Sequence, residues 1–190
     1  PSGTLLSALF ATHFATFGGG LVKALYVALA LMGAWLFYTG NLLWLEARRK
    51  RLSRRADPPV LPEQRPAVRR MAALSVGVCI GSMAGISLTI ASIKWLHLAG
   101  QDPTGWHHAV YYGAFFGAIG WSFLRGAPRA AVELLGLSAA ATLAIPLTSL
   151  VGAMAPGLGL WAHGATLGID VAALVSGLAF AAMAWLTARR

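Results

Sequence analysis

The chain alternates between long apolar stretches and short polar or basic segments. A membrane-spanning helix needs about 20 consecutive, mostly apolar residues, and stretches near or above that length occur at residues 21–45, 71–98, 107–124, 130–151 and 161–187. The alternating pattern of membrane β-barrel strands does not occur in the sequence. The pattern therefore predicts an all-α membrane protein, a bundle of about five transmembrane helices.

The composition agrees with a membrane protein, and it affects how the positive net charge is interpreted. Of the 190 residues, 57% are hydrophobic and 11% are charged, whereas a soluble domain carries about 25% charged residues. The formal net charge of +9 does not indicate a nucleic-acid partner, because the basic residues lie in short segments between apolar stretches. The single cysteine, Cys79, excludes a disulfide framework and a thiolate metal site.

The basic residues also predict how the chain crosses the membrane. Except for Lys23 and Lys94, all of the 15 Lys and Arg residues lie in residues 48–70, 125–129 and 189–190. Positively charged loops stay on the cytoplasmic side of a membrane, so we expect these segments there. The N-terminus and the loops at residues 101–106 and 152–160 then face the periplasm, and the C-terminus faces the cytoplasm.

These observations divide the chain into four parts. Residues 1–20 form a periplasmic or interfacial segment, and Gly18-Gly19-Gly20 lets the chain bend before the first helix. Because the chain starts at Pro1 without a signal peptide, we also expect a further N-terminal part before it. The remaining parts are a first transmembrane helix at residues 21–47, a basic cytoplasmic linker at 48–70 and a four-helix transmembrane region at 71–190.

The five histidines all map to the predicted periplasmic side. Imidazole is the commonest protein ligand of metals and holds haem iron axially. A haem between transmembrane helices needs two imidazoles at similar depth on facing helices. No carboxylate cluster or set of cysteines competes for a metal, so the pattern favours haem over zinc. The candidate ligands are His13, His97, His107, His108 and His163.

The adjacent pair His107 and His108 is expected to supply at most one ligand to an iron, because neighbouring side chains on a helix point about 100° apart. An interfacial role for each histidine is the alternative interpretation. Trp and Tyr residues form an aromatic belt at the same level, and histidine tolerates that interface as they do. The belt consists of Trp95, Trp106, Tyr111, Tyr112 and Trp161.

Two ionisable residues lie inside apolar stretches near the periplasmic side. Lys94 is one turn before His97, and Asp170 lies in the last stretch. A charge in the membrane is unfavourable unless it is paired, and such residues are functional candidates. We expect Lys94 and Asp170 to pair; alternatively, Asp170 orients a ligand imidazole or faces an aqueous cavity. Near the cytoplasmic side, Glu133 is expected to pair with Arg129, four residues before it.

Glycines repeat every four residues in three of the predicted helices. Small residues at this spacing let helices approach closely where no hydrophobic effect drives them together. Alternatively, these glycines make room for a flat cofactor between the helices. The repeats are Gly77, Gly81 and Gly85, then Gly113 and Gly117, then Gly164 and Gly168.

Motifs of soluble enzymes do not occur in the chain. There is no GxGxxG motif after a strand, no P-loop and no HExxH motif. Serine, histidine and aspartate do not occur in the order of a catalytic triad either. The sequence therefore gives little support to nucleotide binding or hydrolysis.

Two stretches of the chain carry a family resemblance. The first reads HFATFGG from His13, KALY from Lys23 and TGNLLWLEARR from Thr39; the second begins with YY at Tyr111 and ends with LRGAPRAAVELL from Leu124. Both resemble the C-terminal half of bacterial PepSY-associated transmembrane proteins, and the resemblance covers most of the chain. It implies a multi-pass protein of the bacterial inner membrane, with periplasmic PepSY-like regions between earlier helices.

The resemblance also implies a function. Several such proteins are associated with iron uptake, and some are ferric-siderophore reductases that carry haem between their helices. The histidine of the HFATFGG stretch is a candidate haem ligand in that family, and it matches His13 here. No family motif covers the other histidines, so His97, His107, His108 and His163 are candidates from topology alone.

The resulting hypothesis is a haem-containing inner-membrane reductase that passes electrons to ferric iron in periplasmic siderophores and thereby releases the iron. One or two haem b groups are expected, with His13 and His163 on haem iron, His97 and His108 as further ligands, and part of the site in the preceding N-terminal half. The expected partners are a ferric siderophore, membrane lipid and an electron donor of unknown identity. Two alternatives stay open: a membrane transporter without haem, and a PepSY-type regulatory scaffold.

Overall fold

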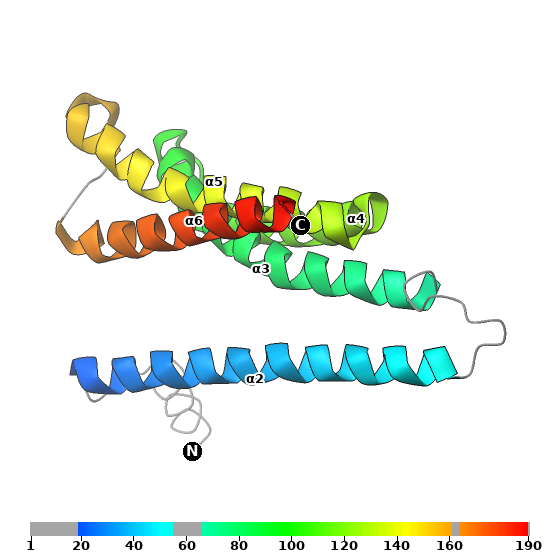
Figure 1. The fold of residues 1–190 in the computed structure, drawn as a ribbon. Coiled ribbons are helices and arrows are strands. Elements are labelled where there is room, and N and C mark those ends of the chain that lie inside the picture. Colours follow the sequence, from blue (N-terminus) through cyan, green and yellow to red (C-terminus); the bar gives the residue numbers. More distant parts are fainter. Residues whose placement is uncertain (1–18, 55–65, 161–163, 190) are drawn as a thin grey trace, which may run out of the picture. The chain divides into compact units, whose positions relative to one another are not determined.

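The computed structural model describes residues 19–54, 66–160 and 164–189, which form helices joined by short turns (Figure 1). No strand occurs in these ranges, so the prediction of an all-α protein is confirmed for them. The 3-10 helices η2 (Pro156–Leu158) and η3 (Gly164–Thr166) lie between the last two α-helices. The α-helices are α2 (Gly19–Arg54), α3 (Pro66–Leu98), α4 (Pro103–Arg125), α5 (Ala127–Met154) and α6 (Leu167–Ala188).

The chain divides into two units, Pro1–Pro62 and Glu63–Arg190, and α2 is the described helix of the first. Its first part, Gly19–Ala30, is apolar. Its last turns are basic, and Lys50 Nζ lies 3.7 Å from a carboxylate oxygen of Glu46, one turn before it. The helix has 36 residues and continues into the segment predicted as a linker, because arginine and lysine favour the helical conformation.

Three helices, α3, α5 and α6, are long and apolar enough to cross a membrane. By the same criteria α4 is not among them, although it has 23 residues. Its first turns carry the polar side chains of Thr104, His107 and His108, which lower its average hydrophobicity. The described residues therefore form a multi-pass helical membrane protein. The two other predicted spans, at residues 21–45 and 107–124, and the orientation of the protein in the membrane stay predictions.

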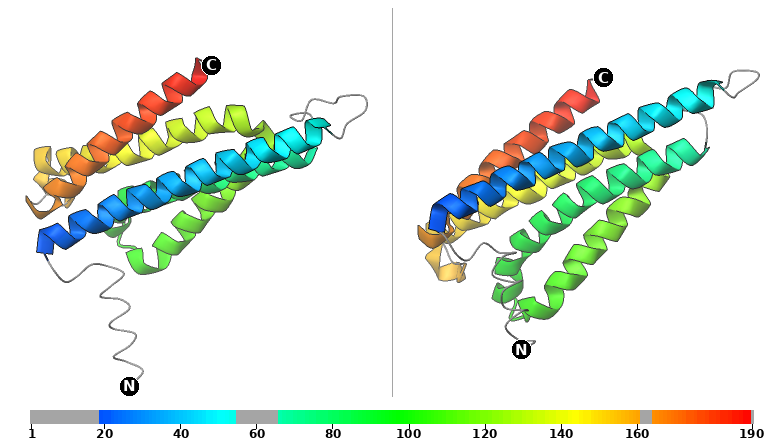
Figure 2. Two further views of the ribbon diagram at one scale, coloured as in Figure 1. Left: turned by 60° about the horizontal axis from the view of Figure 1, so that its bottom comes forward. Right: turned by 90° about the horizontal axis from the view of Figure 1, so that it is seen from below.

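Within the second unit, α3 to α6 form an open arrangement in which α5 packs against both α3 and α6 (Figure 2). The fourth helix, α4, packs mainly against α3 and less extensively against α5. A small core of Ala118, Ala130 and Leu134 joins α4 and α5, and Val76 and Ile80 of α3 pack against it. Large apolar side chains along α6 stay exposed because its main described neighbour is α5.

The interface between α3 and α4 is built on glycines. A Cβ atom at Gly77 would lie 2.7 Å from the Cα of Ile119, and one at Gly81 would lie 2.7 Å from the Cβ of Ala118. At Gly85 it would lie 3.0 Å from the ring of Tyr111. Real Cβ atoms do not approach other atoms this closely, so only glycine permits the observed separation of the helices. The packing interpretation of this repeat is therefore confirmed.

The glycine repeats of the later helices behave differently. A Cβ atom at any of these positions would meet no atom within 4 Å. They therefore do not mediate close helix contacts among the described residues, although their spacing predicts it. The positions are Gly113 and Gly117 in α4, Gly164 in η3 and Gly168 in α6.

The segment between α5 and α6 turns the chain back. A Cβ atom at Gly152 would lie 2.7 Å from the carbonyl oxygen of Leu160, so a glycine is needed where the chain folds against the end of α5. Gly159 has a φ of 75°, a left-handed conformation that favours glycine. The last helix begins at Leu167, later than the predicted residue 161, because 3-10 turns occupy part of the intervening segment.

Candidate functional site: a buried polar bridge beside the histidines

A chain of hydrogen bonds joins three helices close to one end of the second unit. Lys94 Nζ on α3 donates to Ser149 Oγ on α5 at 2.6 Å. Ser149 Oγ donates in turn to Asp170 Oδ1 on α6 at 2.8 Å. Lys94 and Ser149 are buried, with 9% and 7% of their surfaces exposed, and Asp170 is partly buried. We call Lys94, Ser149 and Asp170 the polar bridge.

The serine hydroxyl suits this position because it both accepts and donates a hydrogen bond. Its oxygen accepts from the lysine amino group, and its proton is directed to the aspartate carboxylate. Thr166 Oγ1 also lies 3.5 Å from the other carboxylate oxygen, Asp170 Oδ2. The structure thus brings Lys94 and Asp170 together as expected, but through Ser149, and no direct ion pair joins them among the described residues.

A second polar contact lies on the same α3–α5 interface. Ser87 Oγ and Thr142 Oγ1 are 2.8 Å apart, and both residues are buried. The partners in this contact are 55 positions apart in the sequence, as are Lys94 and Ser149. This equal offset shows that α3 and α5 run parallel, with two polar layers seven residues apart.

A spacing of seven residues in the sequence marks the members of these two polar contacts. Serine or threonine recurs at a spacing of seven residues on α5, at Thr142 and Ser149, and Ser87 and Lys94 have the same spacing on α3. A seven-residue repeat keeps side chains on one face of a helix. Single hydroxyl residues in an apolar stretch are common, so the pairing of the two faces becomes visible only when the helices are placed side by side.

The described histidines lie at the end of the hairpin formed by α3 and α4. His97 is exposed in the last turn of α3, three residues after Lys94 of the polar bridge. His107, partly buried, and His108, exposed, lie in the second turn of α4. The connection between the helices is short, with Asp102 as N-cap residue of α4. His97 and the α4 histidines therefore lie at the same end of neighbouring helices.

The rings of His107 and His108 lie side by side. Their centroids are 4.1 Å apart and their planes are tilted by 37°. Rings in this contact leave no room for an iron between them, so α4 can supply one axial ligand at most. A haem site at this end of the helices stays a prediction. The candidates His13 and His163 lie outside the described residues.

In the described ranges, no group of three or more His, Cys, Asp or Glu side chains is placed to hold a metal ion. The polar bridge contributes one carboxylate, and its other members are a serine and a lysine. The bridge therefore joins α3, α5 and α6.

The turn before α4 is fixed by its own hydrogen bonds. Asp102 Oδ1 accepts from the backbone N–H of Thr104 at 3.0 Å and caps the helix. This bond, a hydrogen bond from the Thr104 hydroxyl and the nearby His107 hold the pKa of Asp102 below its ordinary value. Trp106 Nε1 donates to Gln101 Oε1 at 3.2 Å. The cap therefore determines where the helix with the two adjacent histidines begins.

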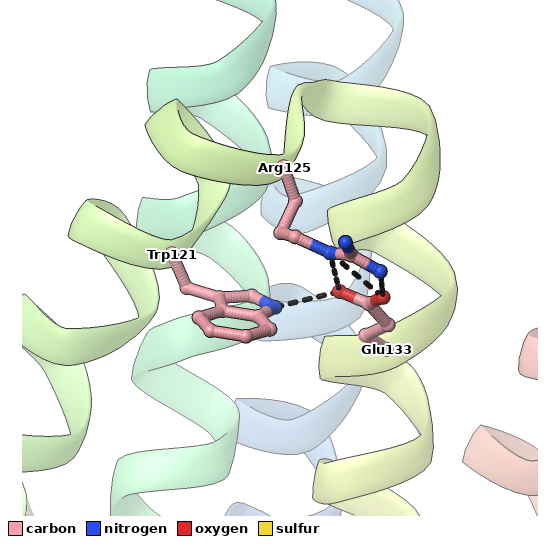
Figure 3. Close-up of polar contacts among 3 residues, drawn as sticks. All are labelled: Trp121, Arg125 and Glu133. Atoms are coloured by element: carbon pink, nitrogen blue, oxygen red, sulfur yellow. Dashed lines mark hydrogen bonds and ion pairs between the residues drawn. The ribbon is translucent and has the colours of Figure 1, made fainter.

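At the opposite end of the unit, Glu133 on α5 binds two residues of α4 (Figure 3). Arg125 forms an ion pair with it, with Nε 3.0 Å from Oε1. Trp121 Nε1 donates to Oε2 at 2.6 Å. The predicted pair with Arg129 is therefore wrong. The turn between α4 and α5 brings the planar guanidinium of Arg125 onto the carboxylate from the neighbouring helix, where both oxygens are engaged at once.

The apolar helices and the polar groups buried between them define a class: a multi-pass α-helical membrane protein with a polar bridge inside its helix packing. Residues 1–47 match a protein family described as the PepSY-associated TM region. The family resemblance is thus confirmed for this part, which contains His13 and most of α2. No curated protein and no solved structure matches the chain.

Proposed function

We propose that this protein is a haem-containing reductase of the bacterial inner membrane that passes electrons to ferric iron in periplasmic siderophores. One observation carries the proposal: His97 and His107 lie at the same end of neighbouring helices, in a chain whose first 47 residues match the PepSY-associated TM region. The ferric-siderophore reductases among the PepSY-associated proteins carry haem between their helices. Bound at this end, haem would supply a one-electron carrier near the membrane surface.

The residues of this chain would hold and position that carrier. His97 and one of the α4 histidines are the described candidates for axial ligands, and His13 and His163 are the candidates outside the described residues. The polar bridge anchors α3 to α5 and α6 one turn from His97. This anchoring would fix the depth of His97, because a shift of α3 would remove the hydrogen bond of a buried lysine.

In the proposed reaction, an electron donor in the membrane or cytoplasm would be oxidised by one electron, and this electron would pass by way of the haem to Fe(III), leaving Fe(II) in the siderophore. Ferrous iron is a softer ion and binds hard oxygen ligands less strongly, so the siderophore releases it. In the proposed orientation the histidine end faces the periplasm and the arginines of residues 66–70 and 125–129 face the cytoplasm, in line with the distribution of positive charge. All five apolar stretches would then span the membrane.

The decisive experiment is an optical spectrum of the full-length protein, expressed with ample haem, oxidised and then reduced with dithionite. We expect a haem b difference spectrum that His97→Ala and His13→Ala weaken or shift. Ser82→Ala is the control, because this exposed hydroxyl bonds only to the backbone of its own helix. Reoxidation of the reduced haem by a ferric siderophore would complete the test. A flat spectrum contradicts the proposal.

The polar bridge favours a transporter as the second candidate. Ionisable residues inside a membrane often belong to substrate or proton paths, and Asp170 is partly buried between α5 and α6. A transporter would lack the haem spectrum and would show proton-coupled uptake that Asp170→Asn abolishes. The haem spectrum and the uptake measurement, both made on the same purified protein, therefore distinguish the two candidate functions.

A further inference from the structure

The arginines at the end of the second unit opposite the histidines surround a cavity. Its volume is about 470 Å³, and Arg69 of α3, Arg125 of α4 and Arg129 of α5 line it. A neighbouring hollow of about 260 Å³ shares Arg69 and adds Arg70. We call this pair of hollows the basic pocket. Arginine residues from three different helices thus line one space.

A tight turn builds the basic pocket. Gly126 is the only residue between α4 and α5, and its φ of 76° lies in the left-handed region that favours glycine. The turn brings Arg125, the last residue of α4, close to Arg129 in the first turns of α5. The carboxylate of Glu133 holds Arg125 in place, and the indole of Trp121 in turn donates a hydrogen bond to that carboxylate. The pocket is therefore fixed by contacts that are already present in the protein.

Among the described residues, the positive charge of the basic pocket exceeds the negative charge beside it, because Glu133 is the carboxylate that acts on both Arg125 and Arg129. Glu133 is engaged with Arg125. Arg69, Arg70 and Arg129 form no ion pair with any residue that the structure describes. Guanidinium groups bind phosphate oxygens through paired hydrogen bonds. An anion in the larger hollow would lie beside Arg69 and Arg129, with Arg70 in the neighbouring hollow.

The surroundings of the basic pocket indicate what kind of anion it binds. Val68 and Pro128 form apolar parts of its lining, and Phe123 lines the neighbouring hollow. Next to it, Leu124 of α4 is 82% exposed. A phosphate beside an apolar surface is the pattern of a phospholipid, whereas a free phosphate needs only the charges. Basic pockets between helix ends are known to bind anionic headgroups.

We infer that the basic pocket binds the phosphate headgroup of an anionic phospholipid, with its acyl chains along the exposed apolar residues of α4. This site is independent of the proposed haem chemistry, because it lies at the other end of the helices. It gives Arg69 and Arg129 a specific role beyond the general attraction of basic residues to a membrane surface.

The test compares lipids on the full-length protein purified in detergent. Dioleoyl-phosphatidylglycerol and dioleoyl-phosphatidylcholine are titrated separately, and bound lipid is counted by native mass spectrometry. We expect selective binding of phosphatidylglycerol. The double variant Arg69→Gln/Arg129→Gln should weaken it by roughly fivefold for each arginine, or about 25-fold together. The control Lys50→Gln/Arg189→Gln removes the same charge outside the pocket and should leave the binding unchanged.

Three outcomes would overturn the inference. Equal binding of the two lipids would show that the pocket does not select an anionic headgroup. Equal losses in the pocket and control variants would show a diffuse charge effect. Displacement of phosphatidylglycerol by millimolar glycerol phosphate or inorganic phosphate, with equal thermal stabilisation by these small anions, would show a site for free phosphate. If the double variant does not fold, Arg69→Lys/Arg129→Lys keeps the charge and should still weaken binding, because lysine cannot form the paired hydrogen bonds.

Discussion

Lys94 and Asp170 lie on helices that have no extensive contact with each other, yet both bind the hydroxyl of Ser149. The hydroxyl lies on α5, which packs between the two helices. A single neutral side chain therefore connects a buried amino group with a carboxylate. This relationship makes Ser149 a necessary link of the polar bridge, although it carries no charge itself.

Ser149→Ala should destabilise the protein by about 1–3 kcal/mol, because it leaves a buried donor and a carboxylate without their common partner. Thermal unfolding of the purified protein in detergent measures the change. Ser92→Ala is the matched control, since the Ser92 hydroxyl bonds to the backbone of its own helix at Thr89. Equal melting temperatures for the two variants would mean that the bridge does not contribute to stability.

Lys94→Met should destabilise the protein by up to about 3–5 kcal/mol, because the partly buried carboxylate of Asp170 then loses the positive charge that balances it. The double variant Lys94→Met/Asp170→Asn removes both charges and should recover most of this loss. A double-mutant cycle of unfolding free energies gives the coupling directly. Additive effects of the two single changes would show that the residues are not coupled through Ser149.

Gly77→Ala and Gly113→Ala should have opposite effects. At Gly77 the added methyl group would meet the backbone of Ile119 at 2.7 Å and force α3 and α4 apart, at a cost of about 1–3 kcal/mol. At Gly113 it would meet no atom within 4 Å, and alanine should stabilise α4 by about 0.5–1 kcal/mol. Circular dichroism melts of both variants test this. A destabilised Gly113→Ala would indicate a contact outside the described residues.

Asp102 should make the stability of the α4 cap depend on pH. Its pKa in the folded protein lies below the ordinary value of 3.8, so the carboxylate stabilises the folded state above that value. This contribution is lost as the pH falls from 3.8 through the folded pKa. Asp102→Asn keeps a capping side chain but does not titrate. The melting temperatures of protein and variant should therefore converge below this range, and a constant difference would contradict the assignment.

The sequence predicted most of the helices well because their apolar length is a local property. It located α3 and α5 to within a few residues, and it placed Lys94 and Asp170 at similar depth, although they meet through Ser149 and do not form the predicted direct pair. Ser149 was missed, because a serine in an apolar helix is usually bonded to its own backbone, as Ser82 and Ser92 are here.

The sequence was less successful at predicting which helix faces contact each other. Apolar residues occur on every face of α5 and α6, so the hydrophobic periodicity of these helices does not show which neighbour each one contacts. The repeat at Gly77 marks an interface, but the equally spaced Gly113 and Gly117 do not. Glu133 was assigned to Arg129 on its own helix, whereas Arg125 reaches it across the turn. Such choices depend on how helices are placed in space.

The equal offset of the two polar layers on α3 and α5 limits how these helices can move. Sliding one helix along the other by a turn, about 5.4 Å, would break the contact of Ser87 with Thr142 and that of Lys94 with Ser149 at the same time. The pair is therefore expected to behave as a single rod. At the α3–α4 interface the close approach at Gly77 and Gly81 takes the place of such hydrogen-bonded layers, and α4 is held to α5 instead, by the bonds of Arg125 and Trp121 to Glu133.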